Sequence, residues 1–472
     1  MTKSIKADIC IIGAGSGGLS VAAGAAQLGK DVVLIEKGEM GGDCLNYGCV
    51  PSKALLAAGA AAQASRTSSK FGVKAQEPEI DFGAVMDHVH GVIATIAPVD
   101  SQERFEGFGV NVIREHGSFV DAKTVKAGDI LIKAKYFVIS TGSSPFTPPI
   151  PGLENTPYFT NENIFENRTC PDHLLVIGGG AIGIEMAQAH QRLGSKVTLI
   201  EGFTILGRDD PDAAALIREK LTEEGIEVIE NAKATEFSGS DGAVSVTLEG
   251  GRTVSGSHVL MAVGRKPNVD GLNLESAGVE FDRSGVKTDA RLRSTNKRIF
   301  AIGDVAGGKQ FTHVAGDHAS TFVRNVLFKT PAKKNDAIAP HVTYCDPEVA
   351  SIGLTEKEAR EQLGDDFSVV HWSFEENDRA QAELATDGFI KAIVKKNGEI
   401  LGATIVGKGA GDIISMWAYA MANKQKIRSF TNFIAPYPTR GEISKRAGSA
   451  FYTKTLFSDK TKKLIKTLSI FD

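Results

Sequence analysis

Residues 13–18 read Gly-Ala-Gly-Ser-Gly-Gly and directly follow an apolar run at residues 7–12. The order of apolar run, glycine turn and alanine-rich stretch predicts a buried strand that leads into a helix. A second apolar run at residues 32–35 ends in Glu36. A strand, a glycine turn, a helix and a second strand closed by an acid are typical of a dinucleotide-binding unit.

Each glycine of this turn has its own expected task. Gly13 makes the tight turn, Gly15 lets backbone N–H groups approach a pyrophosphate at the helix N-terminus, and Gly18 lets the helix pack on the strand. Glu36 is placed to accept a hydrogen bond from a ribose hydroxyl. One such pattern is weak evidence, because short glycine patterns also occur without a nucleotide.

The pattern occurs a second time, and the repeat decides the fold class. The apolar run at residues 174–177 leads into Gly178, Gly180 and Gly183, and Glu201 closes the next apolar run. The acid follows the first glycine by 23 positions in both copies. Two copies in the same context predict that the chain binds two dinucleotides.

Further turn signals indicate how the chain is divided. Thr141-Gly142 and Gly264 each close an apolar run, and Asp304 ends another. The predicted fold class is α/β, with two doubly wound dinucleotide-binding domains of the Rossmann type and a C-terminal α+β domain for dimerisation. The predicted boundaries are 1–150 and 151–270 for the two nucleotide domains, 271–338 for a return to the first, and 339–472 for the C-terminal domain.

Length and composition narrow the class of protein. The 472 residues predict about three packed units of roughly 150 residues. With 53 Lys and Arg against 57 Asp and Glu, the formal charge is −4, so nucleic acid is not an expected partner. No uninterrupted apolar run approaches the roughly 18 residues that a membrane-spanning helix needs, which predicts a soluble protein without membrane contact. The basic segment around Lys460–Lys466 is interpreted as a solvated surface helix.

Five cysteines, an odd number, favour a reducing, cytoplasmic location with at most one working pair. Cys44 and Cys49 lie in the segment 41–53, Gly-Gly-Asp-Cys-Leu-Asn-Tyr-Gly-Cys-Val-Pro-Ser-Lys. No further cysteine or histidine cluster completes a zinc site, so no metal is predicted. Residues five apart in a regular helix are about 8–9 Å apart at Cα, whereas a disulfide tolerates about 7 Å. A bridge therefore needs a distorted turn, which Gly48 would permit.

In chain order, these motifs resemble those of the flavoprotein pyridine nucleotide-disulfide oxidoreductases, especially the dihydrolipoamide dehydrogenase and mercuric reductase branches. The similarity runs over essentially the whole chain. It rests on the segments 13–18, 41–53, 140–142 (STG), 178–185 (GGGAIGIE), 301–306 (AIGDVA) and 346–356 (DPEVASIGLTE).

The resemblance implies FAD at the first glycine motif and a nicotinamide cofactor at the second. It implies that Cys44 and Cys49 are a redox disulfide, with Cys49 facing the flavin and Cys44 exchanging with substrate. By the same resemblance, Lys53 and Glu185 form an ion pair near the flavin and Asp304 holds the flavin's ribityl chain. Gly117, Thr141, Gly142 and Gly264 are further expected cofactor contacts, and a homodimer with shared sites is expected.

Glu201 bears on the choice of nicotinamide cofactor. A carboxylate there accepts from a free 2′-hydroxyl and repels a 2′-phosphate. No arginine lies between Glu201 and Arg208 to offset that repulsion. We therefore predict NAD rather than NADP.

The chain departs from the family pattern near its C-terminus. Thiol-handling members share His-Pro-Thr-x-x-Glu, in which the histidine takes a proton from a dithiol. Here Tyr437 stands at the histidine position, Glu442 is kept, and no histidine follows His371. A phenol, with an ordinary pKa of about 10, is a poor proton acceptor at neutral pH. Tyrosine at this position resembles mercuric reductase, whose terminal cysteine pair is nevertheless missing, since no cysteine follows Cys345.

The predicted function is electron transfer between NAD(H) and a thiol, disulfide or soft-metal acceptor through Cys44 and Cys49. The protein is placed nearest to dihydrolipoamide dehydrogenase, with Tyr437 and Glu442 as further site residues. A mercuric reductase-like enzyme, an NADH oxidase or diaphorase with idle cysteines, and a redox-sensing partner without turnover are the alternatives. The small-molecule substrate itself and the direction of turnover stay open.

Overall fold

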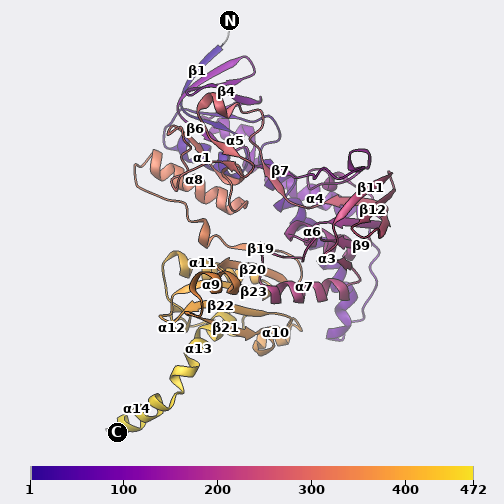
Figure 1. Cartoon of the computed structure of the whole chain (residues 1–472), viewed down its shortest axis with the longest axis vertical. Coiled ribbons are helices and arrows are strands. Elements are labelled where there is room, and N and C mark those ends of the chain that lie inside the picture. Colours follow the sequence, from indigo (N-terminus) through magenta and orange to yellow (C-terminus); the bar gives the residue numbers. More distant parts are fainter. Residues whose placement is uncertain (1–2, 471–472) are drawn as a thin grey trace.

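The computed structural model describes residues 3–470 and has three lobes (Figure 1). The N-terminal lobe holds the first glycine motif, the middle lobe holds the second, and the C-terminal lobe follows residue 339. Two nucleotide-binding-type lobes and an α+β lobe confirm the predicted α/β fold class.

The N-terminal lobe is built on a sheet with four adjacent parallel strands in the order β3-β2-β1-β6, to which β18 adds in parallel. This order is that of a Rossmann half. Both faces of the sheet are buried, since β2 is buried throughout and alternate residues of β1 belong to two different apolar clusters. The elements are β1 (Lys3–Ile12), α1 (Ser16–Gln27), β2 (Val32–Ile35), β3 (Asn111–Ile113), the antiparallel β4 (Gly117–Asp121) and β5 (Thr124–Ala127), β6 (Ile130–Ile139), β18 (Ile299–Ala301) and α8 (Thr312–Val326).

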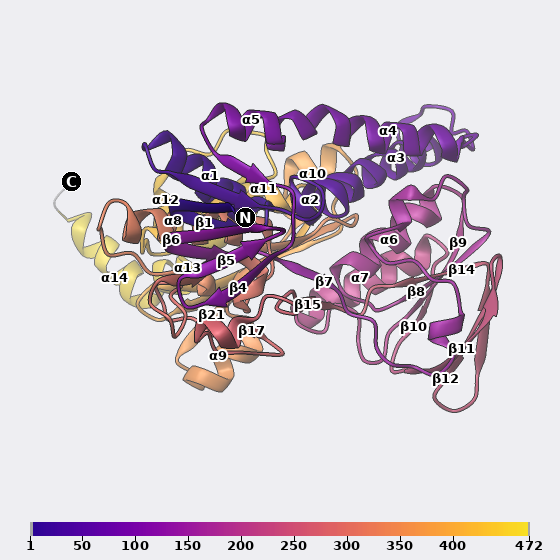
Figure 2. The same cartoon turned by 90° about the horizontal axis from the view of Figure 1, so that it is seen from above.

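Helices α2 (Gly42–Asn46), α3 (Cys49–Thr67), α4 (Phe82–Ile96) and α5 (Gln102–Gly107) extend from this lobe toward the middle lobe (Figure 2). Helix α3 packs closely on α6 of the middle lobe, because Gly59 leaves room: a Cβ there would lie 3.4 Å from the Ala189 carbonyl oxygen. The chain's cysteine segment is thereby fixed against the second nucleotide unit.

The helical run Phe82–Gly107 differs from the sequence expectation. Among residues 3–470 it is the one stretch long and apolar enough, by length and composition, to cross a membrane. In the structure it is interrupted by a 3-10 turn with Pro98, and α4 buries Phe82, Met86 and Val89. The prediction missed this run because its few polar residues interrupt the apolar sequence without lowering the mean hydropathy enough.

The middle lobe repeats the nucleotide-binding topology, with parallel strands in the order β10-β9-β8-β14. A three-stranded antiparallel sheet, β11-β12-β13, packs on it through an apolar cluster that includes Phe237 and Leu175. The elements are β8 (His173–Ile177), α6 (Ala181–Arg192), β9 (Lys196–Ile200), α7 (Pro211–Glu223), β10 (Glu227–Ile229), β11 (Ala234–Ser240), β12 (Ala243–Leu248), β13 (Thr253–Gly256) and β14 (His258–Met261). The two-stranded pairs β7 (Ser143–Pro145) with β15 (Arg265–Pro267), and β16 (Phe281–Asp282) with β17 (Gly285–Val286), complete the connections.

The C-terminal lobe is an antiparallel sheet in the order β19-β20-β23-β22-β21. Trp417 and Ile443 on its covering helices are fully buried in one apolar cluster with this sheet. Helix α14 projects from the body at the end opposite the N-terminus (Figure 1). The elements are β19 (His341–Thr343), β20 (Glu348–Gly353), α9 (Glu356–Leu363), β21 (Phe367–Ser373), α10 (Asp378–Ala382), β22 (Phe389–Lys395), β23 (Ile400–Gly407), α11 (Ala410–Ala422), α12 (Ser429–Asn432), α13 (Glu442–Leu456) and α14 (Asp459–Leu468).

Candidate active site

One continuous cleft of about 2050 Å³ runs between the three lobes. It collects residues that are far apart in the sequence. Most predicted site residues line it: Gly13, Gly15, Glu36, Cys44, Cys49, Lys53, Gly117, Thr141, Gly142, Gly178, Gly180, Glu185, Glu201, Gly264 and Asp304. Gly18 and Gly183 lie just behind this lining, whereas Tyr437 and Glu442 lie on the C-terminal lobe outside the cleft.

The first glycine of each motif has the same conformation. Gly13 has φ +106° and Gly178 has φ +111°, a region that side chains other than glycine rarely adopt. A Cβ at either position would lie 2.4 Å from a carbonyl oxygen of the adjoining strand end, that of Ser140 for Gly13 and that of Ala262 for Gly178. Both turns therefore require glycine for the predicted reason.

The later glycines differ from the first in what surrounds them. A Cβ at Gly18 would lie 1.9 Å from the Gly13 carbonyl oxygen, and one at Gly183 would lie 1.8 Å from that of Gly178, so these two allow helix and turn to meet. At Gly180 no atom lies within 4 Å of such a Cβ, and at Gly15 the nearest is 4.0 Å away. The open space at Gly15 and Gly180 lets the helix N-termini face a ligand.

The two closing acids bond the glycine turns in the same way. Glu36 Oε2 accepts from the Ala14 N–H at 2.6 Å, and Glu201 Oε2 accepts from the Gly179 N–H at 2.6 Å. Glu36 Oε1 accepts from Gly38 at 2.7 Å, and Glu201 Oε1 accepts from Phe203 at 2.9 Å. Each carboxylate is thus fixed at the edge of its turn, and both residues line the cleft.

The cysteine segment is broken between its two thiols. Cys44 lies in α2, Cys49 begins α3, and Gly48 between them has the non-helical angles φ −130° and ψ −112°. A Cβ at Gly48 would lie 3.0 Å from the Asp43 carbonyl oxygen, so glycine permits the break. The predicted distortion is confirmed, and it places the two free thiols near each other, so that the Cys44 side chain affects the pKa of Cys49.

The two thiols have opposite acidities. Cys49 is the exposed thiol of the two. Hydrogen bonding by the Cys44 side chain, with further help from Thr312 and Lys53, lowers the pKa of Cys49 to about 6. The same hydrogen bond, together with burial, raises the pKa of Cys44 above its ordinary value. Thr312 Oγ1, at the start of α8, lies 3.5 Å from Cys49 Sγ. Cys49 is therefore the thiolate of the pair.

Lys53 lies one turn beyond Cys49 on α3 and forms an ion pair with Glu185 of α6. The Lys53 Nζ to Glu185 Oε2 distance is 2.8 Å, and Glu185 is only 4% exposed. The second carboxylate oxygen accepts from the Tyr344 N–H at 2.9 Å. Lys53 Nζ also lies 4.4 Å from the centroid of the Tyr344 ring. All three lobes thus meet at this ion pair.

Asp304 belongs to a second polar group, which reaches Asp43 beside Cys44. Its Oδ2 accepts from the Ser143 hydroxyl at 2.6 Å, and burial raises the pKa of this carboxyl. Arg265 donates to the same hydroxyl at 2.8 Å and pairs with Asp43 Oδ1 at 3.0 Å. Asn161 also donates to Asp43, at 3.0 Å. The residue next to Cys44 is therefore tied to the predicted flavin-binding aspartate.

The remaining cofactor-contact predictions lie beside the two glycine motifs: Gly117, Thr141 and Gly142 are near the first motif, and Gly264 follows β14, whose end adjoins the second. Gly117 packs on β1 and β2, where a Cβ would lie 3.2 Å from side-chain carbons of Ile12 and Ile35. The Thr141 hydroxyl donates to the Asn268 carbonyl at 2.6 Å. Gly142 and Gly264 have φ +68° and +137°, and a Cβ on either would meet no atom within 4 Å.

Tyr437 and Glu442 do not form the dyad that the family pattern suggests. The Tyr437 hydroxyl donates to Asp378 Oδ2 at 2.8 Å, which raises the pKa of this phenol. Glu442, the first residue of α13, pairs instead with Arg446 at 2.8 Å. Tyr437 is 69% exposed on the C-terminal lobe. Within one chain, these two residues therefore stand apart from the thiols.

Sequence reasoning missed several residues that line the cleft: Asp43, Asn161, Lys233, Arg265, Thr312 and Tyr344. Lys233 matters for cofactor choice, because its Nζ lies 5.3 Å from the Phe203 ring, beside the loop that follows Glu201. Lys233 is 32 positions beyond Glu201 in the sequence, and the fold brings it beside Gly202, the residue that follows this acid. Across residues 3–470, no group of three or more His, Cys, Asp or Glu side chains is arranged to hold a metal ion.

Comparisons with known proteins agree with this geometry. Residues 7–319 match the family model described as pyridine nucleotide-disulphide oxidoreductase, and residues 339–447 match that family's dimerisation domain. A mercuric reductase of Streptomyces lividans is 34% identical and a dihydrolipoyl dehydrogenase of Geobacillus stearothermophilus is 35% identical; each alignment covers 94% of this chain and 96% of the relative.

Solved structures show the same architecture. The flavoprotein disulfide reductase RclA from Escherichia coli, in its Cu(II) complex, superposes with a TM-score of 0.84 at 28% identity, over 93% of this chain and 99% of that one. LpdA from Mycobacterium tuberculosis superposes with a TM-score of 0.86 over 94% and 99%, and at 24% identity it speaks to the fold alone. The chain belongs to the pyridine nucleotide-disulphide oxidoreductases, the flavoprotein family whose enzymes combine FAD, a nicotinamide cofactor and a redox-active disulfide.

Proposed function

We propose that this enzyme uses NADH to reduce a soft-metal or disulfide acceptor through Cys44 and Cys49. The observation that carries the proposal is the neighbouring pair of thiols, Cys44 and Cys49, together with the Lys53–Glu185 ion pair in one cleft that both glycine motifs line. Cys49 is the inner thiol of the proposal and Cys44 is the thiol that meets the acceptor.

The first glycine motif fits FAD. The open space at Gly15 would admit a pyrophosphate, Glu36 would accept from the ribose, and Asp304 would hold the ribityl chain. Bound FAD would supply the two-electron chemistry that connects a nicotinamide hydride with a disulfide. The equivalent open space at Gly180, with Glu201 at its edge, fits NADH.

The thiols carry the electrons onward. A Cys44–Cys49 disulfide that takes up two electrons and one proton becomes a Cys49 thiolate and a Cys44 thiol. When the pair reduces a disulfide acceptor, the bridge re-forms, and the acceptor leaves as two thiols that carry the proton of Cys44 and one proton from solvent. Thr312 and Lys53 favour the thiolate on Cys49, so the proton of the reduced pair stays on Cys44. The Lys53 ammonium, fixed by the buried Glu185, keeps a positive charge on the side of Cys49.

The state of Tyr437 argues for an acceptor that needs no base. Because its hydroxyl donates to Asp378 and its pKa is raised, this phenol does not take a proton from a dithiol near pH 7. A soft metal ion bound by thiolates requires no such base. The mercuric reductase relatives and the Cu(II) complex of RclA support metal ions as the class of acceptor.

The assembly proposal follows from the same residues. We infer a homodimer in which Tyr437 and Glu442 of one subunit complete the other's thiol site, supported by the dimerisation-domain match and by the exposure of Tyr437. We also propose that the domains of each subunit end at residues 150, 270 and 338, as the sequence predicts. A cytoplasmic location is proposed from the small, odd number of cysteines.

A side-by-side NADH turnover assay tests the acceptor. Wild type and Tyr437→His are compared with lipoamide, Hg(II), Cu(II), a small disulfide and a quinone. We expect thiol-dependent turnover with the metal ions, little with lipoamide, and a gain of lipoamide turnover in Tyr437→His. High lipoamide turnover in wild type would contradict the argument that the site has no base to take a proton from a dithiol. It would favour dihydrolipoamide dehydrogenase activity, which is the second candidate because a dihydrolipoyl dehydrogenase is 35% identical.

The same assay separates the oxidase alternative. An NADH oxidase or diaphorase would keep its turnover after Cys44 and Cys49 are alkylated in the reduced enzyme. The proposed enzyme loses turnover with metal ions and disulfides under this treatment.

A further inference from the structure

Tyr344 stands where the three lobes meet, and the motifs gave it no role. It follows β19 of the C-terminal lobe, lines the cleft, and is 42% exposed. Lys53 Nζ lies over the Tyr344 ring, 4.4 Å from its centroid, and the Tyr344 N–H donates to Glu185 Oε1 at 2.9 Å. One residue thus contacts both members of the ion pair, through the ring on one side and through the backbone on the other.

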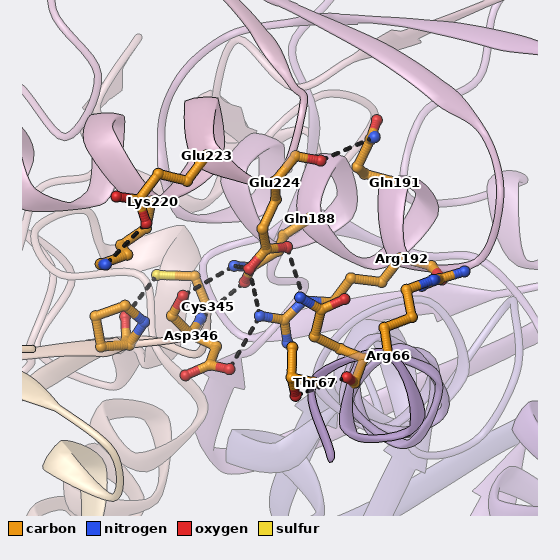
Figure 3. A network of polar contacts seen from close by, with 12 residues as sticks. Arg66, Thr67, Gln188, Gln191, Arg192, Lys220, Glu223, Glu224, Cys345 and Asp346 are labelled. Atoms are coloured by element: carbon orange, nitrogen blue, oxygen red, sulfur yellow. Dashed lines mark hydrogen bonds and ion pairs between the residues drawn. The ribbon is translucent and has the colours of Figure 1, made fainter. Parts of the chain in front are cut away.

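The turn that carries Tyr344 is clamped to helix α6. Glu185, Gln188 and Arg192 are spaced three and four residues apart, so they lie on one face of the helix. Gln188 exchanges two hydrogen bonds with the backbone of Asp346, at 2.9 and 2.7 Å. Arg192 pairs with the Asp346 carboxylate at 2.9 Å, as Figure 3 shows.

The clamp is itself buried and braced. Gln188 is 1% exposed and Arg192 is 6% exposed. Arg192 Nε also donates to Glu224 Oε2 at 2.8 Å, and the Arg192 carbonyl accepts from Arg66 of α3 at 2.7 Å (Figure 3). A fully paired network of this kind holds its members in one geometry. The position of the Tyr344 ring is therefore set by the rigid contact between α6 and the C-terminal lobe.

Lys53 needs a second partner besides Glu185, because the ion pair alone leaves its side chain several accessible conformations. A lysine ammonium is a flexible point charge on a four-carbon stem. Its side chain here is 37% exposed, while Glu185 is buried. An aromatic face within about 6 Å attracts the ammonium and restricts where it can lie. We propose that Tyr344 is a positioning residue of the active site, whose ring holds the Lys53 ammonium beside Glu185 and toward Cys49.

This inference rests on the proposed function only in taking Cys49 as the reactive thiol. The Cys49 thiol is faced by Cys44 and Asp43 from α2, Thr312 from α8, Lys53 from its own helix, and Tyr344 from the C-terminal lobe. Tyr344 is uncharged near neutral pH, since burial raises its pKa above the ordinary value. Replacing it by another uncharged residue changes the field at Cys49 through the placement of Lys53.

The test is the pH dependence of Cys49 alkylation in the reduced holoenzyme, read by peptide mass spectrometry after a short exposure to iodoacetamide. Tyr344→Leu removes the ring, Tyr344→Phe keeps it, and Tyr419→Leu is the control at an exposed tyrosine of α11. We expect the midpoint for Tyr344→Leu to rise by about half a pH unit or more. Tyr344→Phe and Tyr419→Leu should titrate as wild type.

Two outcomes would overturn the proposal. An unchanged midpoint in Tyr344→Leu means that the ring does not place Lys53, and an equal rise in Tyr344→Leu and Tyr344→Phe assigns the effect to the hydroxyl. Should Tyr344→Leu not retain FAD, Asp346→Asn decides, because it keeps the Tyr344 side chain but weakens the clamp that holds its ring against Lys53. Removing the Asp346 carboxylate would by itself lower the pH midpoint of Cys49 alkylation. A rise of this midpoint in Asp346→Asn therefore supports the role of the clamp, and an unchanged or lowered midpoint contradicts it.

The result is separable from the proposed function. The alkylation profile reports the Cys49 thiol whether or not any acceptor is turned over. Absence of turnover with every acceptor, alongside the expected shift in Tyr344→Leu, would reject the acceptor proposal and keep the role of Tyr344.

Discussion

At the scale of the residue, the Cys49 thiol is the group whose protonation the site controls. The Cys44 side chain is its neighbour, the Thr312 hydroxyl lies 3.5 Å away, and Lys53 places a positive charge nearby. These neighbours lower the pKa of Cys49 to about 6. A lowered pKa means that the thiolate is present above that pH and is lost as the pH falls through it.

Removing the hydroxyl of Thr312 should therefore move the thiolate to higher pH. In Thr312→Val, the alkylation rate of Cys49 in the reduced enzyme is expected to fall off at a higher pH than in wild type, because one donor to the thiolate is lost. Thr312→Ser, which keeps the hydroxyl, is the control. A profile for Thr312→Val that overlies that of wild type would show that Thr312 does not act on the thiolate.

Cofactor choice is also decided by single residues. Glu201→Ala removes an acceptor for the 2′-hydroxyl and a repulsion against a 2′-phosphate, so kcat/KM for NADH should fall about tenfold and the preference over NADPH should narrow. Lys233→Ala should change the ratio in the opposite direction. Equal ratios of the two kcat/KM values in wild type and Glu201→Ala would contradict the assignment of NAD.

The site residues that belong to motifs could be predicted from the sequence, because each motif is a short contiguous segment with a recognisable order of residue types. Lys53 follows Cys49 by one turn, and Glu185 lies in the second glycine motif. Thr312 and Tyr344 come from distant segments whose residue types have no pattern of their own, and only the fold brings them to Cys49. The partner of Tyr437 was missed for the same reason, since Asp378 is far away in the sequence.

At the scale of the element, the strand–turn–helix unit depends on a close approach that glycine alone allows. A Cβ at Gly18 of α1 would lie 1.9 Å from the Gly13 carbonyl oxygen, whereas one at Gly24 of the same helix would meet its nearest atom at 3.6 Å. Gly18→Ala should therefore displace α1 from the turn and lose FAD, as measured by flavin absorbance of the purified protein. Gly24→Ala should retain FAD. Full FAD content in Gly18→Ala would contradict the packing argument.

Element boundaries were predictable where the apolar pattern was clear. The run 32–35 is β2, as expected. The strand β1 begins at Lys3, earlier than the predicted residue 7, because it pairs with β6 along its whole length. Polar residues at its start do not carry the apolar pattern, so only the partner strand reveals them.

At the scale of the whole molecule, buried charges connect the lobes. Lys391 of β22, 7% exposed, donates to Asp210, the N-cap of α7, which is 1% exposed. Lys391→Met would leave the Asp210 carboxylate buried without its cation and should lower the free energy of unfolding by about 3 kcal/mol. Thermal or denaturant unfolding of the holoenzyme measures this.

Lys395 offers a matched control on the same strand. It pairs with Glu399 at 3.0 Å at a more exposed position, so Lys395→Met should change the stability by less than about 1 kcal/mol. Equal changes in the free energy of unfolding for Lys391→Met and Lys395→Met would mean that the buried ion pair between the lobes stabilises the protein no more than an exposed one. No sequence pattern pointed to Lys391 and Asp210, since they belong to different lobes and lie 181 positions apart in the sequence.

The account depends on electrons from NADH reaching Cys49 beside the flavin, and an anaerobic NADH titration of the purified holoenzyme tests this most directly. Wild type should take up more than one electron pair per FAD and develop a long-wavelength charge-transfer band. The band should be absent in Cys49→Ser and should survive in Cys44→Ser. A band that persists in Cys49→Ser, or wild-type uptake that stops at one pair per FAD, would contradict the account.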